Sequence, residues 1–175
     1  MNAFDKASEV EKRGTLAVME LIKAQFPRWR VARTWEATER GKALQTQFGD
    51  LFIWTEKEIL QVAELKIEQV NRHGNAFLET WSNFLKKPGW MFSCNCDLLI
   101  YHFLDHKETF IFEMPKLKEW FHGSGYRRFD QKCQQAYDQK NDTRGVCVPF
   151  AVLRDEVGFR YFRDDQPATF PRSAK

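Results

Sequence analysis

The sequence contains no uninterrupted apolar run long enough to cross a membrane. A transmembrane helix needs roughly 18 or more consecutive, predominantly apolar residues, so we expect the protein to have no membrane partner. Residues 1–6 also lack the apolar segment of a secretory signal peptide. These two absences predict a cytoplasmic protein.

Cysteine is scarce, with four residues and no spacing typical of a disulfide framework, which predicts reduced thiols. A zinc site is an alternative, because a short segment holds four soft ligands: Cys94, Cys96, His102 and His106. Their spacing does not match a zinc finger, which separates its two pairs of ligands by about twelve residues. We therefore interpret the cysteines as small, buried apolar residues.

Internal repeats and low-complexity tracts are also lacking. The chain has 175 residues, of which 43% are hydrophobic and 15% aromatic, enough for a packed core. We predict one domain over residues 1–163 and a mobile tail over residues 164–175, where Pro167 and Pro171 lie. The net charge of +3 is compatible with a nucleic-acid partner without requiring one.

Hydrophobic periodicity predicts an α/β protein that begins with an amphipathic helix over residues 5–25, capped by Ser8 with Glu11 as its capping-box partner. The other expected elements follow in chain order: strand 28–35, loop 38–47, strands 48–54 and 59–70 around a turn at 55–58, strand 76–81, a short helix or turn at 90–95, a buried strand 97–104, strand 109–114, helix 116–121, helix 131–139, strand 146–153 and strand 158–163.

Two carboxylates and a lysine are expected to meet on the hairpin formed by strands 48–54 and 59–70. Side chains alternate along a strand, so Glu64 and Lys66 share one face while Leu65 lies on the other. If the turn closes at 55–58, Asp50 lies about level with Glu64. Two hard oxygen ligands suit Mg²⁺ or Mn²⁺, and a nearby ammonium can offset phosphoryl charge. The alternative interpretation is an exposed hairpin face whose charges are simply solvated.

Asp50, followed after thirteen intervening residues by Glu64-Leu65-Lys66, resembles the signature of the PD-(D/E)XK nuclease superfamily. Gly49 stands where the family's motif has proline. The resemblance implies a restriction-endonuclease-like fold: a mixed central sheet flanked by helices, with an αβββαβ kernel in which a strand at 76–81 replaces the helix that follows the site. It also implies that Asp50, Glu64 and the carbonyl of Leu65 bind the metal ion and that Lys66 positions the attacking water.

Some members of that superfamily carry a further glutamate on the first helix. Glu20 is our candidate for that role, and Glu9 lies nearly in line with it on the same side of the helix. Glu79 is a candidate outer ligand, general base or ion-pair partner. For each glutamate the alternative is an ordinary solvent-facing or paired carboxylate.

Basic residues outside the hairpin are candidates for contacts with the nucleic-acid backbone. The segment 28–42 is rich in arginine and lysine, and the loop 82–89 carries two lysines before a Pro-Gly break. The candidate contact residues are Arg40, Lys42, Asn83, Lys86 and Lys87. Ordinary surface charge is the alternative.

The sequence therefore predicts a Mg²⁺- or Mn²⁺-dependent nuclease acting on DNA, of a size that would suit a phage or mobile element. The main alternative is a non-catalytic nucleic-acid-binding or interaction module on the same fold, and a further alternative is an RNA-processing enzyme. Cleavage of both strands of a duplex needs two active centres, so a homodimer is expected.

Overall fold

The computed structural model describes residues 3–34, 39–135, 142–163 and 166–169, and within these ranges it divides the chain into two compact units. The first comprises Met1–Asn71, Asn95–Met114 and Phe159–Lys175, and the second comprises Arg72–Cys94 and Pro115–Gly158. The second unit is thus formed by two segments inserted into the first. The prediction of a single domain over residues 1–163 stays a prediction. In the described part of the chain, no helix is long and apolar enough to cross a membrane.

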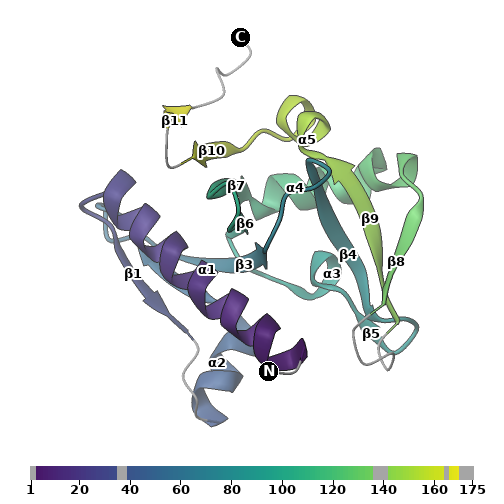
Figure 1. The fold of residues 1–175 in the computed structure, drawn as a ribbon, viewed down its shortest axis with the longest axis horizontal. Coiled ribbons are helices and arrows are strands. Elements are labelled where there is room, and N and C mark those ends of the chain that lie inside the picture. Colours follow the sequence, from purple (N-terminus) through teal and green to yellow (C-terminus); the bar gives the residue numbers. More distant parts are fainter. Residues whose placement is uncertain (1–2, 35–38, 136–141, 164–165, 170–175) are drawn as a thin grey trace. The chain divides into compact units, whose positions relative to one another are not determined.

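The first unit is a seven-stranded mixed sheet with the strand order β1-β2-β3-β6-β7-β10-β11 (Figure 1). Strands β3 and β6 are parallel and every other neighbouring pair is antiparallel. The strands span Arg30–Arg33 (β1), Leu51–Trp54 (β2), Leu60–Glu68 (β3), Leu98–Phe103 (β6), Glu108–Glu113 (β7), Arg160–Arg163 (β10) and Gln166–Thr169 (β11).

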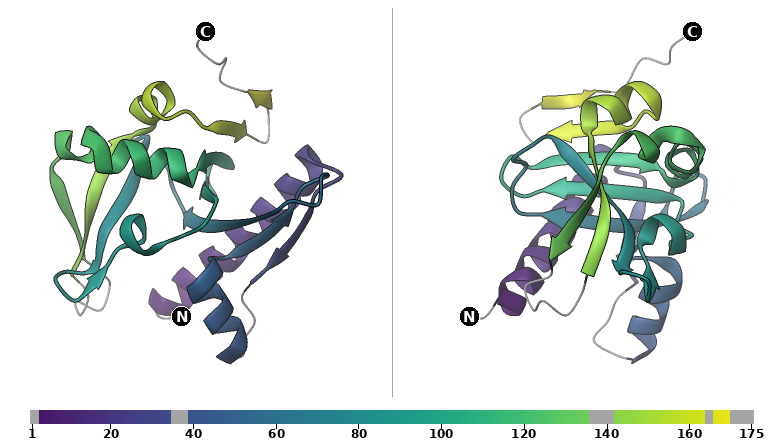
Figure 2. Two further views of the ribbon diagram at one scale, coloured as in Figure 1. Left: turned by 180° about the vertical axis from the view of Figure 1, so that it is seen from behind. Right: turned by 90° about the vertical axis from the view of Figure 1, so that its right-hand side faces the viewer.

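The helix α1, Ala3–Gln25, packs on one face of this sheet (Figures 1 and 2). Val18 and Ile22 of the helix are buried against alternate residues of the strands, among them Ile53, Leu65 and Ile100. The apolar stripe of α1 and the period-two pattern of the strands therefore form one core, as the hydrophobic spacing predicted. On β2 and β3 the residues that alternate with these core positions, including Phe52, Glu64 and Lys66, lie on the opposite face of the sheet.

Strand β6 is buried at all six positions, which confirms its prediction as a central strand with both faces covered. A buried polar pair joins it to β7, where His102 Nδ1 and Thr109 Oγ1 are 2.8 Å apart. Its partner β7 continues into the helix α4, Met114–Trp120.

The second unit contains a four-stranded antiparallel sheet with the order β5-β4-β9-β8. Its strands are Asn75–Asn83 (β4), Lys87–Pro88 (β5), Gln131–Gln135 (β8) and Asp142–Pro149 (β9). Its helices are Trp90–Ser93 (α3), Phe150–Glu156 (α5) and the part of α4 from Pro115 onward. A π-helical turn at Phe121–Gly125 and a 3₁₀ turn at Tyr126–Arg128 follow α4. Along β4, Ala76, Leu78 and Thr80 are buried, in the alternation expected of a one-sided strand.

Four local predictions were wrong. The predicted loop 38–47 is the helix α2, Glu39–Phe48, because strong helix formers fill it despite Gly41. The predicted helix 131–139 is instead the strand β8 as far as Gln135, paired with β9. The predicted strand 146–153 ends at Pro149, after which α5 begins. Ser8 lies inside α1 and so cannot cap it.

The predicted tail 164–175 contains a strand that the sequence did not indicate, because β11 pairs antiparallel with β10. Residues 164–165 and 170–175 lie outside the described part of the chain.

Candidate metal-binding and catalytic site

Gly49 sets the position of Asp50. The helix α2 ends at Phe48, and Gly49 N–H donates to the Gln45 carbonyl at 2.8 Å. Gly49 has φ of +84°, and a Cβ atom at this position would lie 2.9 Å from the Ala63 carbonyl oxygen. Only glycine adopts such a backbone at low cost. A tight turn can therefore deliver the next residue directly onto the edge of the sheet.

Asp50 directly precedes β2 and is hydrogen-bonded on both sides. Its N–H donates to the Ala63 carbonyl at 2.8 Å, and its own carbonyl accepts from Thr34 N–H at 3.0 Å. The register pairs Leu51 with Ala63, so Asp50 and Leu51 both lie opposite Ala63, the residue before Glu64. The turn at 55–58 closes the hairpin as predicted, with Thr55 N–H donating to the Ile59 carbonyl.

The carboxylate of Asp50 is held by one hydrogen bond on each oxygen. Gln45 Nε2 donates to Oδ1 at 2.7 Å, and Leu65 N–H donates to Oδ2 at 2.7 Å. An ionised carboxylate has about four lone-pair sites, so one on each oxygen remains beyond these two bonds. Asp50 is therefore fixed in orientation while retaining capacity for a further ligand.

Glu64 and Lys66 form an ion pair on the face of β3 opposite α1. Lys66 Nζ lies 2.6 Å from Glu64 Oε1, and the side chains are 29% and 18% exposed, respectively. The Asp50 carboxylate accepts its hydrogen bond from Leu65, the residue between Glu64 and Lys66, and we call Asp50, Glu64 and Lys66 the carboxylate–lysine cluster.

Leu65 serves both the core and the cluster. Its side chain is buried against α1, and its N–H points toward Asp50. The N–H and the carbonyl of one strand residue point to the same side. The Leu65 carbonyl therefore lies on the strand edge that faces Asp50, as a backbone oxygen donor to an ion there would require.

Glu11 of α1 is a residue of this region that the sequence analysis assigned only to a helix cap. Burial raises the pKa of its carboxyl group, the negative charge of Asp50 raises it further, and the positive charges of Lys66 and Lys12 lower it. Although the residue as a whole is exposed, its carboxyl group is therefore near enough to the cluster to be influenced by both charges.

Glu20, the predicted helix ligand, is not brought to the cluster. It is exposed, as is Glu9. Nine residues separate Glu11 from Glu20, and at 3.6 residues per turn this places them on opposite sides of the helix. The core residues Val18 and Ile22 could have indicated that Glu11, and not Glu20, lies on the side of α1 that faces the sheet. Glu11 precedes them by seven and eleven positions, a spacing that keeps all three residues on one side of the helix.

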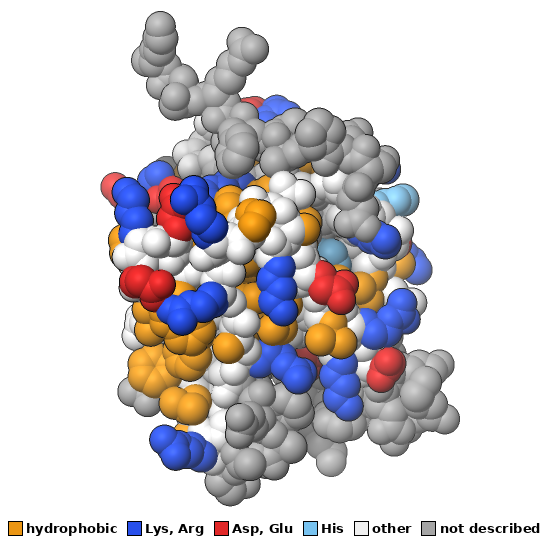
Figure 3. All heavy atoms as spheres, turned by 90° about the vertical axis from the view of Figure 1, so that its left-hand side faces the viewer, with side chains coloured by type: hydrophobic (Ala, Val, Ile, Leu, Met, Phe, Trp, Pro, Cys, Tyr) orange, Lys and Arg blue, Asp and Glu red, His pale blue; other side chains and the backbone are white. Residues whose placement is uncertain are grey.

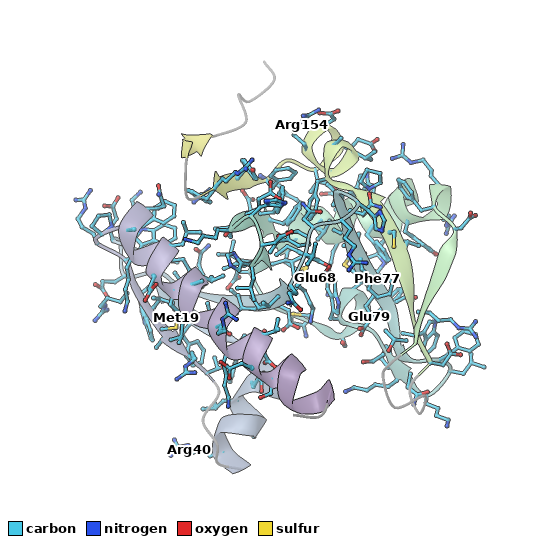
Figure 4. The ribbon with its side chains drawn as sticks, in the orientation of Figure 1. Met19, Arg40, Glu68, Phe77, Glu79 and Arg154 are labelled. Atoms are coloured by element: carbon cyan, nitrogen blue, oxygen red, sulfur yellow. The ribbon has the colours of Figure 1, made fainter. Side chains whose placement is uncertain are left out.

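A second buried carboxylate lies farther along β3. Burial raises the pKa of Glu68, and the hydrogen bond that it accepts from the Tyr101 hydroxyl lowers it. Figure 4 labels Glu68 in the first unit, whereas Glu79, the candidate outer ligand, lies on β4 of the second unit.

The candidate nucleic-acid contacts fall in both units. Arg40 is exposed on α2 and projects outward from it (Figure 4); the side chain of Lys42 lies outside the described residues. Asn83, at the end of β4, is half-buried and its carbonyl accepts from Lys86 N–H at 2.9 Å. Lys86 and Lys87 are exposed at the turn into β5.

The residues of the alternative zinc site are engaged in the packing of the fold. Cys96 is buried and Cys94 half-buried, while His102 contacts Thr109 and His106 lies 3.4 Å from Asp105. Among the described residues, no three or more His, Cys, Asp or Glu side chains form a group that could hold a metal ion. Glu11, Asp50 and Glu64 thus do not form a closed cage; Mg²⁺ is often bound through only one or two carboxylates and several waters.

Comparisons with known protein families, with curated proteins and with solved structures found no match to this chain.

Proposed function

We propose that the protein is a Mg²⁺- or Mn²⁺-dependent nuclease that hydrolyses DNA phosphodiester bonds at the carboxylate–lysine cluster. The observation that carries the proposal is that Asp50 is hydrogen-bonded to both neighbours of Glu64, through its N–H to Ala63 and through its carboxylate to Leu65, while Lys66 Nζ lies 2.6 Å from Glu64 Oε1. A pair of carboxylates beside an ammonium is a donor set suited to a hard cation and a phosphate.

The order of elements supports a restriction-endonuclease-like fold. The chain runs α1, β1, β2, β3, α3, β6, with β1 to β3 antiparallel and β6 parallel to β3. With α2, β4 and β5 set aside, this order is that of the αβββαβ kernel of the PD-(D/E)XK superfamily, although α3 has only four residues and belongs to the second unit. The helix α2, between β1 and β2, and the strands β4 and β5, before α3, are additions to that kernel.

The residues present fit a divalent ion. Asp50 retains a lone pair on each oxygen beyond its two hydrogen bonds, and the Leu65 carbonyl lies on the strand edge that faces it. Glu64 supplies the second carboxylate, and Glu11 is a further oxygen donor nearby. When bound, the ion would lower the pKa of a coordinated water and offset charge on the scissile phosphate.

The protein's own residues have separable roles in this proposal. Gln45 and the Leu65 N–H hold the Asp50 carboxylate in one orientation. Lys66 forms an ion pair with Glu64, and its ammonium group would orient the attacking water and attract the phosphate.

A non-catalytic nucleic-acid-binding or interaction module is the alternative. The two hydrogen bonds to Asp50 and the Glu64–Lys66 pair also hold β2 against β3, so the same contacts suit a purely structural cluster. A nuclease should lose cleavage in a chelator and regain it with Mg²⁺ or Mn²⁺, whereas a binding module should retard DNA without cutting it.

Three substitutions test the proposed roles. Asp50→Asn and Glu64→Gln should each reduce DNA cleavage by orders of magnitude and weaken metal binding measured by calorimetry, because they remove the charge that attracts the cation. Lys66→Ala should reduce cleavage comparably while metal binding remains. DNA binding should survive all three, or tighten where a negative charge is lost.

Stability must be measured alongside, because Asp50 also accepts hydrogen bonds. In Asp50→Asn the amide nitrogen would face a donor, at a cost of about 1–3 kcal/mol. Gln45→Ala is the matched comparison, since it removes one of these hydrogen bonds but leaves the charge, and it should reduce cleavage much less than Asp50→Asn does. Leu65→Ala should cost about 2–5 kcal/mol through the core. If wild-type protein with Mg²⁺ or Mn²⁺ never cuts DNA, the nuclease proposal is wrong.

A further inference from the structure

Three aromatic side chains follow one another beside the carboxylate–lysine cluster. Phe52 and Trp54 occupy alternate positions of β2, and Phe52 pairs with Val62, so their side chains share the face of the sheet on which Glu64 and Lys66 of β3 lie. Phe48, the last residue of α2, contacts Phe52 with ring centroids 6.0 Å apart, and Phe52 contacts Trp54 at the same distance. We call Phe48, Phe52 and Trp54 the aromatic stripe.

The stripe is not part of the core that α1 covers. That core uses Leu51 and Ile53, the intervening residues of the same strand. Seen from behind, β1 and β2 lie in front of α1, which matches this division (Figure 2). Phe48 is 36% exposed and Leu60, which pairs with Trp54 on the next strand, is 49% exposed. The stripe is therefore open to solvent in part.

Phe52 and Trp54 are both half-buried, and their neighbours on β1 are a small residue and a cation. The partner of Phe52 on β1 is Ala32. The partner of Trp54 is Arg30, whose guanidinium carbon lies 5.7 Å from the ring centroid. Arg30 also pairs with Glu58, but both side chains are mostly exposed, and such pairs contribute little. Arg30 can therefore exchange Glu58 for a phosphate.

Surface aromatic rings also occur where proteins meet, but here the stripe is continuous with the candidate phosphodiester site. A polymer with one phosphodiester at Asp50 and Glu64 has neighbouring nucleotides that must lie against the adjoining surface, and along β2 that surface is aromatic. A space-filling view shows hydrophobic side chains gathered at the surface among side chains of both charges (Figure 3).

The spacing favours an unstacked strand over a duplex. Bases along one strand of a duplex repeat every 3.4 Å or so, and their flat faces are already covered by one another. The three rings are 6.0 Å apart and tilted to each other by 50° and 52°, so each ring can receive only a base that is separated from its neighbours, as in single-strand binding proteins.

We propose that the aromatic stripe binds the bases of a single-stranded polynucleotide and leads it toward the carboxylate–lysine cluster. This inference rests on the proposed function, because the cluster defines where the phosphodiester lies. The stripe supplies base stacking without sequence preference, and Arg30 contacts the backbone.

Binding in the absence of metal tests the stripe separately from catalysis. Wild-type protein, in a chelator, is titrated with fluorescently labelled oligothymidylate, oligouridylate and the duplex of oligothymidylate with oligoadenylate. Anisotropy should show tighter binding of the single strands than of the duplex, and the first two probes separate DNA from RNA. Trp54→Ala and Phe52→Ala should each weaken single-strand binding by about 5- to 150-fold, the loss expected for one stacked base.

Two further variants guard against misinterpretation. Trp54→Phe keeps an aromatic ring and should retain most of the affinity. If the indole had only a structural role, Trp54→Phe and Trp54→Ala would both lose affinity. Ile59→Ala removes another exposed apolar side chain of the same hairpin, 56% exposed and outside the stripe, and should bind like the wild type. Thermal melting of each variant verifies that it is folded.

The outcomes separate the two proposals. Stripe variants that are folded and bind single strands like the wild type would overturn this inference, even if the protein cuts DNA. Ring-dependent binding of single strands by a protein that never cuts would leave the stripe in place and remove the nuclease. Equal binding of duplex and single strand would also contradict the stripe.

Discussion

At the scale of single residues, the chemistry of the site depends on which carboxylates lie near enough to influence one another's charge. Asp50, Glu64 and Lys66 come from one hairpin, whereas Glu11 comes from a helix on the other face of the sheet. The raised pKa of Glu11 has burial as its main cause and Asp50 as its second. The carboxylates of Glu11 and Asp50 thus repel each other, which lowers the stability of the folded state. Such perturbed pKa values are common at functional sites.

Replacing Glu11 measures that cost. The pKa of Glu11 is raised above its ordinary value of 4.5, so the folded state holds the proton more tightly than the unfolded state. Stability from this group is full below pH 4.5 and is lost as pH rises through the folded pKa. Glu11→Gln should therefore melt at a higher temperature than the wild type at neutral pH, and the difference should shrink toward pH 4.5.

Thermal melts over this pH range are the measurement, with Glu20→Gln as the matched control on the exposed side of α1. A lower melting temperature for Glu11→Gln at neutral pH would mean that attraction to Lys66 outweighs burial. In the proposed nuclease the same variant should also cleave more slowly, because an oxygen donor near the site is lost.

At the scale of elements, the turn between α2 and β2 decides where Asp50 lies. Gly49→Ala should destabilise the protein by roughly 1–3 kcal/mol, the usual cost of a non-glycine residue at such a backbone conformation. The added methyl group would also approach the Ala63 carbonyl. Because relief of this contact moves Asp50 away from β3, cleavage should fall more than stability alone explains.

Denaturant unfolding and cleavage assays of the same preparation measure the two effects. Gly74→Ala is the control, because Gly74 also has a positive φ of 63° but nothing lies within 4 Å of its added methyl group. If Gly49→Ala and Gly74→Ala lose equal stability and neither loses activity, Gly49 does not position Asp50.

At the scale of the whole molecule, stability at high pH should depend on Tyr161. Burial, followed by its hydrogen bond to Glu108, raises the pKa of Tyr161 to about 12. The ionised phenol is disfavoured in the folded state, so stability is full below pH 10 and falls as pH rises toward 12. Denaturant unfolding across this range should show a steeper loss for the wild type than for Tyr161→Phe, which has no proton to release. Parallel slopes would contradict the assignment.

Binding of nucleic acid by the whole chain has a salt dependence that tests the turn before β5. If Lys86 and Lys87 contact phosphates, replacing both with alanine should reduce the slope of log affinity against log salt by about two units, since each neutralised phosphate contributes about 0.9. Lys23→Ala, at the end of α1, is the control. An unchanged slope would mean that these exposed lysines lie away from the nucleic acid.

The hairpin cluster was accessible from the sequence, because its geometry is local. Side chains alternate along a strand, and a turn of four residues sets the pairing, so the pairing of β2 with β3 and the common face of Glu64 and Lys66 follow from counting. Counting placed Asp50 opposite Glu64, whereas its N–H bonds to Ala63. The burial of Leu65 and the central position of β6 follow from the same alternation and from an unbroken apolar run. The helix α2 was missed because one glycine outweighed nine better helix formers in our interpretation.

Only the tertiary structure decided which glutamate of α1 meets the cluster and that β3 pairs in parallel with β6. Glu9, Glu11 and Glu20 are all polar helix positions, and the choice among them depends on how the helix docks on the sheet. Parallel pairing joins segments separated by a whole insertion, for which the sequence carries no local signal. Short-range geometry can be counted along the chain, whereas docking is decided by the packing of distant apolar surfaces.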